Sequence, residues 1–179
     1  MAQAIASATV QLGFLTILQE SNGFLGGYLV TNQWGRPLEF RLSTAVQPNR
    51  IHQILYGQTL QGYLCGELIG KTLVEKCTAQ PQFILTDKPH ALHLRPHVQA
   101  PVLLLGDGGA SLGESPALCV RSAGEKQTAV FAHSRFPEDR EAIEQLLERL
   151  DGRLDLNEPF LRVREAVAEA RKMGVTGHG

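Results

Sequence analysis

The order of segments in the first half of the chain constrains the fold more than any single residue does. Three strand-like runs are followed by a helical region, a short apolar strand and an acidic residue. In chain order these segments are Leu12–Glu20, Gly27–Asn32, Pro37–Ser43, Pro48–Lys76, Phe83–Thr86 and Asp87. Strands joined by tight turns pair antiparallel, whereas parallel strands need a longer crossover connection. The order therefore predicts an α/β fold whose mixed sheet begins with a three-strand antiparallel meander.

Hydrophobic patterning and turn residues place the first three strands within that sheet. The first strand is apolar on both faces, which is typical of a central strand. Asn22-Gly23 is a strong hairpin signal, and the pair Gly26-Gly27 indicates a bulge or a close backbone approach. The third strand alternates apolar and polar residues from Leu38 to Ser43, which predicts a half-exposed strand at an edge of the sheet.

The helical region carries more glycine than one uninterrupted helix favours. Glycine inside a helix costs about 1 kcal/mol relative to alanine. We therefore expect two helices, at about 49–56 and 59–76, with a break near Gly57. Glycines at positions 62, 66 and 70 then form a smooth strip on one helical face, and we interpret this strip as close packing against the sheet.

The second half of the chain adds one more core strand and a C-terminal extension. Pro101–Leu105 is a short apolar run that we expect to pair parallel with the strand at 83–86. The predicted organisation has a flexible N-terminus, an α/β core, a glycine-rich loop, a C-terminal hairpin with two helices packed on the core, and a tail. These parts span residues 1–9, 10–106, 107–116, 117–173 and 174–179.

Composition excludes several classes of function. The formal net charge is −1, which argues against tight, purely electrostatic binding of nucleic acid, although a local basic patch remains compatible with it. The three cysteines are widely spaced and form no CxxC pair, so we interpret them as buried thiols in a reducing compartment. The sequence shows neither a signal peptide nor an apolar run of membrane-spanning length. These features predict a cytoplasmic protein without a membrane association.

Three short motifs resemble the ribonuclease H-like superfamily over residues 10–105. Glu20-Ser21-Asn22-Gly23 leads to Gly26-Gly27-Tyr28, Pro48-Asn49-Arg50-Ile51-His52 opens the helical region, and Leu85-Thr86-Asp87 ends the fourth strand. The resemblance implies catalytic positions on the first strand, the first helix and the fourth strand. It places Glu20, His52 and Asp87 at these positions, with Glu20 and Asp87 as ligands of Mg²⁺ or Mn²⁺. In that superfamily, two metal ions promote phosphodiester hydrolysis.

The departures from the superfamily pattern bear on activity. Magnesium prefers oxygen ligands, so His52 is a poor substitute for a carboxylate. We also find no position for a fourth acidic residue. The sequence therefore favours a catalytically degenerate binding or scaffold module that acts with nucleic acid or with a nucleic-acid-processing partner. One alternative is a metal-dependent nuclease. Another is a structural adaptor whose C-terminal helices, within residues 137–173, bind a protein partner or form a homodimer.

Other polar positions are candidates for binding. Trp34 lies beside Arg36 in a predicted turn, where it either stacks on a base or folds back on the sheet. Arg41 and Arg50 extend this candidate surface if the meander and the first helix share a groove. His90, His93 and His97 share one face if their segment is helical, which permits a transition-metal site. Pro89 and Pro96 argue against a regular helix there, so we do not favour a metal site. We interpret His52 and His133 as ordinary half-buried histidines.

Overall fold

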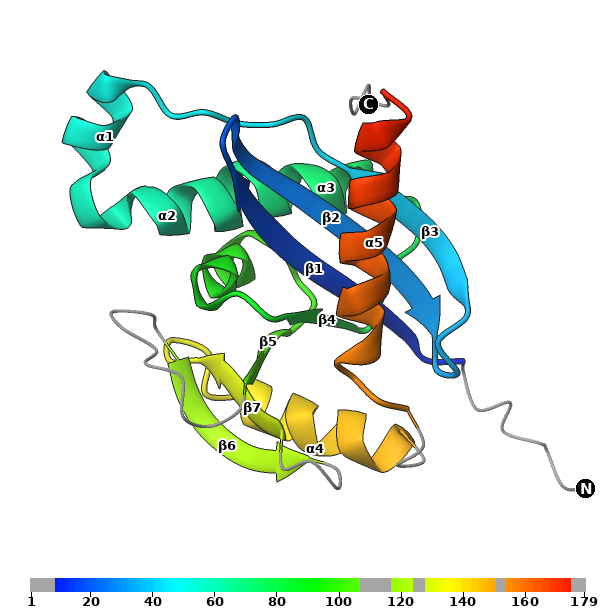
Figure 1. Ribbon diagram of the computed structural model, residues 1–179. Coiled ribbons are helices and arrows are strands. Elements are labelled where there is room, and N and C mark those ends of the chain that lie inside the picture. The colour runs from blue at the N-terminus through cyan, green and yellow to red at the C-terminus, as the bar shows by residue number, and fades with distance from the viewer. Residues whose placement is uncertain (1–8, 107–116, 124–127, 151–153, 175–179) are drawn as a thin grey trace, which may run out of the picture.

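A single seven-stranded mixed sheet organises the protein (Figure 1). The structure is a computed structural model that describes residues 9–106, 117–123, 128–150 and 154–174. The strand order across the sheet is β3-β2-β1-β4-β5-β7-β6. The strands are β1 (Gln11–Glu20), β2 (Gly23–Asn32), β3 (Pro37–Leu42), β4 (Phe83–Thr86), β5 (Val102–Gly106), β6 (Ala117–Ala123) and β7 (Thr128–His133). The predicted α/β class with a mixed sheet is confirmed.

Strand pairing follows the predicted meander and crossover. β1 pairs antiparallel with β2, and β2 pairs antiparallel with β3 at the sheet edge. β4 is parallel to β1, and β5 is parallel to β4. The hairpin of β6 and β7 then extends the same sheet, because β7 pairs antiparallel with β5. β1 therefore lies in the interior of the sheet, as its two apolar faces predict.

β2 begins four residues earlier than the sequence pattern suggests. Glu20 pairs directly with Gly23 across a two-residue turn, so the strand starts at Gly23 and not at Gly27. Gly23 has a φ of 118°, a conformation that a side chain rarely adopts. The pair Gly26-Gly27 is a close-approach site and not a bulge. A Cβ on Gly26 would lie 2.3 Å from Ile69, and one on Gly27 would lie 2.5 Å from Val163.

Helical segments cover both faces of the sheet (Figure 1). The α-helices are α1 (Arg50–Tyr56), α2 (Leu60–Gly62), α3 (Thr72–Lys76), α4 (Asp139–Arg149) and α5 (Glu158–Lys172). Two 3₁₀ segments, η1 (Gly57–Thr59) and η3 (Pro89–His97), and one π-helical segment, η2 (Tyr63–Lys71), complete them. The break predicted near Gly57 is present, and Gly57 has a φ of 51°. None of the helices described is long and apolar enough to cross a membrane.

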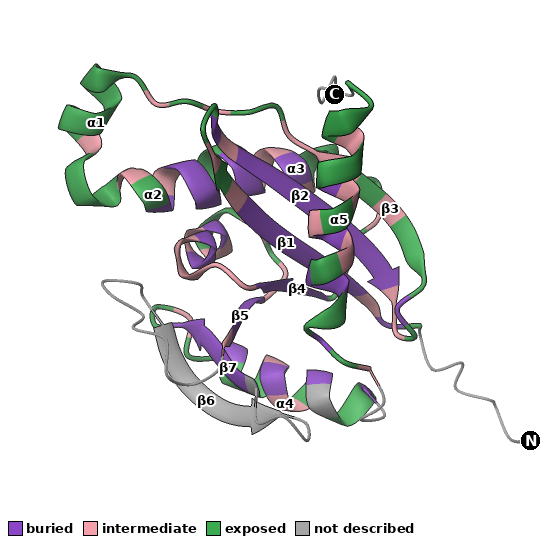
Figure 2. Cartoon of the chain, in the orientation of Figure 1, coloured by how far each residue is buried: buried purple, intermediate pink, exposed green. Residues whose placement is uncertain are grey.

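Two apolar layers fill the space between sheet and helices, and Figure 2 shows β1, β2, β4 and β5 as largely buried strands. One layer joins β1, β4 and β5 to α4 and α5 through residues such as Phe14, Leu103 and Phe160. The other joins the opposite face to η2, α3 and η3 through residues such as Leu15, Ile69 and Leu92. The chain is therefore a three-layer structure with a core on each side of the sheet.

The glycine strip in the helical region packs mainly against η3, which corrects the expectation that it packs on the sheet. A Cβ on Gly62 would lie 2.6 Å from the His93 ring, and one on Gly66 would lie 2.6 Å from the His93 backbone. Of the three glycines, only Gly70 approaches a sheet residue, Leu15. Residues 1–8, the glycine-rich loop at 107–116 and the tail from 175 onward lie outside the described residues.

Candidate functional site

The register of β1 and β4 determines which side chain lies beside Asp87. Leu15 of β1 pairs with Thr86 of β4, so Thr16 lies beside Asp87, the residue that follows β4. The Thr16 hydroxyl donates a hydrogen bond of 2.7 Å to Asp87 Oδ1. Thr16 is fully buried, and the Asp87 side chain is 18% exposed. The first-strand neighbour of Asp87 is therefore a hydroxyl, where the resemblance led us to expect a carboxylate.

The C-terminal helix α5 brings two arginines to the same face of the sheet. Arg164 Nη1 donates to Asp87 Oδ2 and forms an ion pair with it. One heptad further along α5, Arg171 forms an ion pair with Glu20. Seven residue steps along a helix span about 10 Å, and the four residue steps of β1 from Thr16 to Glu20 span about 13 Å. Each predicted metal-binding carboxylate thus receives its own guanidinium from α5.

Glu20, His52 and Asp87 do not form one cluster. Glu20 lies at the far end of β1, four residues beyond the Thr16–Asp87 contact. His52 lies on α1, a helix with no buried residue that projects from the body of the protein (Figure 1). The ring of His52 packs against Tyr56 with a centroid distance of 6.3 Å. The three predicted catalytic residues therefore occupy three separate places in the fold.

The donor set around Asp87 does not fit the two-metal centre that the resemblance implies. Such a centre needs several carboxylates within reach of both ions. Here both Asp87 oxygens have protein partners, a hydroxyl and a guanidinium. Within the described part of the chain, no three His, Cys, Asp or Glu side chains are grouped so that they could hold a metal ion. The cationic partner of Asp87 in this structure is the Arg164 guanidinium.

The predicted binding residues are divided between the two ends of the molecule. Trp34 lies in the turn from β2 to β3 and is 70% exposed, beside Arg36. Arg41 is held by Glu39 in an ion pair of 2.7 Å, and Arg50 lies on the projecting helix α1. Figure 1 shows α1 far from the β2–β3 turn, so these four residues do not share a groove. Trp34 and Arg36 remain together as a candidate contact surface.

The turn that carries Trp34 is held in place by several hydrogen bonds. Asn32 Oδ1 accepts from the backbone N–H groups of Trp34 and Arg36, each at 3.0 Å. Gly35 has a φ of 82°, and its carbonyl accepts a bond of 2.8 Å from Arg162 of α5. No ion pair of Arg36 occurs among the residues described. An exposed indole and a guanidinium are thus presented together on a fixed loop.

The histidine run is dispersed by its 3₁₀ geometry. In a 3₁₀ helix, residues three apart share a face, so His97 is not aligned with His90 and His93. His97 instead lies 3.4 Å from the Glu67 carboxylate. Burial, the His90 charge and the Arg135 charge lower the pKa of His93. His93 packs in T-shaped contact with His133. These contacts are those of structural histidines, of which His93 is half-buried and His133 is buried.

Two described cysteines are buried thiols with raised pKa values. Burial raises the pKa of Cys65 to about 12 and that of Cys77 to about 11. A thiolate is the nucleophilic form, so neither thiol is activated at neutral pH.

The apolar stripes of α4 and α5 are used inside the chain. Ile143, Leu146, Phe160, Val163 and Val167 are all buried in the core beneath the sheet. In contrast, Ile51, Ile54 and Leu55 of α1 are 65%, 65% and 75% exposed. Exposed apolar side chains therefore lie on α1, and the segment where the adaptor hypothesis places the partner surface also exposes Leu161 and Met173, at 55% and 72%.

The sequence reasoning missed Thr16, Arg164 and Arg171. The only signal for the arginines is their seven-residue spacing on the last helix, since residues seven apart share one helical face. That spacing does not reveal which strand the helix follows, because the docking of α5 is a long-range contact between the two ends of the chain.

Comparisons with known proteins provide evidence about the fold alone. A scan against protein-family models finds no match, and a search of curated proteins finds none either. Among solved structures, the chain is similar to an endonuclease V from Bacillus subtilis, with a TM-score of 0.52 and 12% sequence identity. The similarity covers 92% of this chain and 82% of that one. The chain therefore has a nuclease-like α/β fold.

Proposed function

We propose that the chain is a ribonuclease H-like module, catalytically degenerate, that acts as a binding or scaffold component with nucleic acid or with a nucleic-acid-processing protein. The observation that carries this proposal is the pairing of Arg164 with Asp87. An arginine at this carboxylate supplies the neutralising charge that a metal supplies in a two-metal nuclease, but it cannot activate a water as a metal does. The ion pair between Glu20 and Arg171 supports the proposal in the same way.

The nucleic-acid side of the proposal is supported by the Trp34 turn and by the nuclease-like neighbour. An exposed aromatic ring stacks on unpaired bases at about 1–3 kcal/mol per base. Arg36 is in a position to pair with a phosphate of the same strand. The net charge of the chain is −1, so the protein as a whole does not attract phosphates. Binding then depends on the local contact at the Trp34 turn, and this contact requires an unpaired base on which the Trp34 ring can stack. We therefore propose single-stranded nucleic acid as the ligand. We place the protein in the cytoplasm as part of the same proposal.

The test is a binding and cleavage assay on one labelled single-stranded oligonucleotide, in the presence of Mg²⁺ or Mn²⁺. We expect salt-sensitive binding without cleavage. Trp34→Ala and Arg36→Ala should each weaken binding about fivefold or more, in line with the energy of a stacked base. Arg140→Ala, at an exposed position on α4, is the matched control and should bind like the wild type. Binding that is equal in all four proteins would overturn the proposed surface.

The same assay tests the alternative of a metal-dependent nuclease, which the named structural neighbour favours. That alternative predicts cleavage that requires Mn²⁺ or Mg²⁺ and disappears in Asp87→Asn. The folded state of the variant is checked by its thermal unfolding. Metal-dependent cleavage lost in this variant would replace the scaffold proposal with the nuclease.

A further inference from the structure

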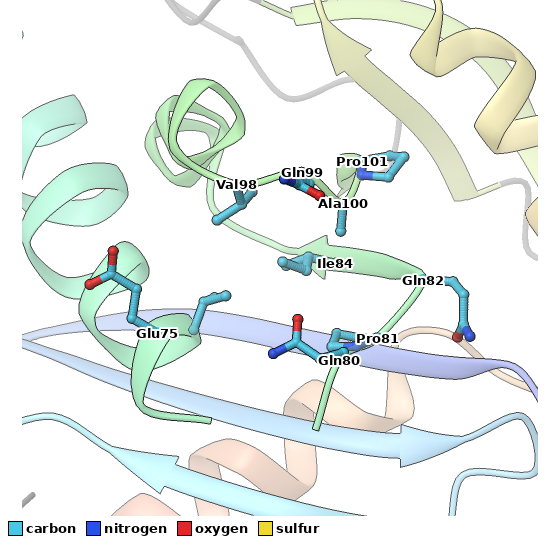
Figure 3. Close-up of a pocket in the computed structure, with 10 residues that line it drawn as sticks. Glu75, Gln80, Pro81, Gln82, Ile84, Val98, Gln99, Ala100 and Pro101 are labelled. Atoms are coloured by element: carbon cyan, nitrogen blue, oxygen red, sulfur yellow. The ribbon is translucent and has the colours of Figure 1, made fainter. Parts of the chain in front are cut away.

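A pocket with a volume of about 570 Å³ lies at the opposite end of β4 from Asp87 (Figure 3). It is bounded by the C-terminal part of α3, the segment that enters β4 and the segment that enters β5. This volume is within the range of small-molecule sites. The pocket belongs to the face of the sheet that η2, α3 and η3 cover, whereas the Asp87 contacts lie on the α5 face.

The lining of the pocket combines apolar walls with neutral hydrogen-bonding groups. Ile84, which is 1% exposed, lies between Gln80 and Gln99 in Figure 3. Val74, Val98 and two prolines provide the other apolar walls. A ligand with an apolar body and a hydrogen-bonding edge matches this arrangement.

The polar groups of the lining restrict the charge of a ligand. Among the described lining residues, Glu75 is the single charged side chain, and Lys71 partly neutralises it from 3.8 Å. None of these lining residues is a lysine or an arginine, so none of them would pair with a phosphate. Gln82 is committed to the fold, because its Oε1 accepts the Gln11 N–H at 2.6 Å. Gln80, Gln99 and Glu75 are therefore the groups that could face a ligand.

We propose that this pocket binds a nucleobase that carries an exocyclic amino group, such as adenine or cytosine, without contact to its phosphate. A carboxamide pairs in two-point fashion with the edge of adenine, and a carboxylate accepts the amino group of cytosine. Gln80 and Gln99 supply the carboxamides and Glu75 the carboxylate. The base belongs either to a free nucleoside or to a nucleic-acid strand in which that base is unstacked. The inference is independent of the proposed function, since it uses neither Asp87 nor the Trp34 turn.

The test is isothermal titration calorimetry of the full chain with adenosine, cytidine and uridine. Adenosine and cytidine should bind more tightly than uridine, which lacks the amino group. The double variant Gln80→Leu, Gln99→Leu should lose at least about tenfold in affinity, or about 1.4 kcal/mol. Gln58→Leu, an exposed glutamine on η1, is the control and should bind like the wild type. Thermal unfolding of each variant verifies that it is folded.

Two further ligands identify the source of the base. Adenosine 5′-monophosphate should bind no more tightly than adenosine, because the lining has no cation for its phosphate. Displacement of an oligodeoxyadenosine by adenosine would identify a strand base as the occupant, whereas adenosine binding without displacement would identify the free nucleoside. The proposal is overturned if no nucleoside binds, if the double variant binds like the wild type, or if the phosphate increases affinity. Trp34→Ala separates this result from the proposed function, because it should leave adenosine binding unchanged.

Discussion

The hydroxyl group of Tyr28 is buried without a hydrogen-bond partner among the residues described. Tyr28 lies on β2 and is fully buried, and its ring extends over Gly13 of β1. A Cβ on Gly13 would lie 2.5 Å from that hydroxyl, so glycine is required there to make room for the ring. Burial also raises the pKa of Tyr28. An unsatisfied buried hydroxyl costs about 1–3 kcal/mol of stability.

Tyr28→Phe should therefore increase the free energy of unfolding by about 1 kcal/mol, because it removes the unsatisfied group and keeps the ring. Urea denaturation followed by circular dichroism measures this change. Tyr63→Phe is the control, since Tyr63 is only partly buried and stacks on Tyr56. A loss of stability in Tyr28→Phe would show that the hydroxyl makes a contact that stabilises the fold.

Glu39 is a second residue whose role is visible in its contacts. Its carboxylate accepts the backbone N–H groups of Ala79 and Thr78, which follow α3, and it pairs with Arg41. The bond from the Ala79 N–H is the main cause that lowers the pKa of Glu39 to about 2. Glu39, on the polar face of the edge strand β3, thus binds the backbone of the segment that follows α3.

A carboxyl group whose folded pKa is depressed stabilises the fold above its unfolded pKa. Stability from Glu39 should therefore be complete above pH 4.5 and be lost as the pH falls toward 2. Glu39→Gln should lower Tm at pH 7 and flatten the dependence of Tm on pH in this window. Differential scanning calorimetry between pH 2 and pH 7 checks both effects. An equally steep acid dependence in the variant would assign it to other carboxylates.

Among the elements, α1 and η2 belong to the same helical region but differ in what they bury. α1 buries no residue, whereas η2 buries Leu64 and also contributes Cys65 and Ile69 to the second core. Gly62 of α2 and Gly66 of η2 both lie close to η3. The apolar spacing in the sequence is similar in both segments, so periodicity alone assigns both to the core. The difference in burial between α1 and η2 depends on the direction in which the linker between β3 and α1 leads the chain.

Serine substitutions at Ile51, Ile54 and Leu55 should each change stability by about 0.5 kcal/mol or less, because these side chains are exposed. Leu64→Ala should cost about 2–5 kcal/mol, since Leu64 is 2% exposed in the core. Chemical denaturation of the four variants measures both effects. A large cost at the α1 positions would mean that α1 packs on the body of the protein or on a second copy.

At the scale of the whole molecule, alternation and turn residues are enough to predict β1, β3 and the parallel pair β4 and β5, because these signals are local. The extra length of β2 was missed, since its glycines resemble loop residues until the close packing of Ile69 and Val163 is known. Of the residues at the candidate site, only Asp87 could be predicted from the sequence, because it directly follows a buried strand. Its partners Thr16 and Arg164 lie 71 and 77 residues away in sequence, and no local pattern connects them.

In the whole molecule, we infer that Arg164, and not a metal ion, neutralises Asp87. The most direct measurement is the thermal unfolding of the wild type during a Mn²⁺ titration, with Asp87→Asn measured alongside. A ligand that binds the folded state raises Tm in a saturable way. We expect no saturable rise of Tm in the wild type that Asp87→Asn lacks. A saturable rise in the wild type that disappears in Asp87→Asn would contradict it and place a metal at the end of β4.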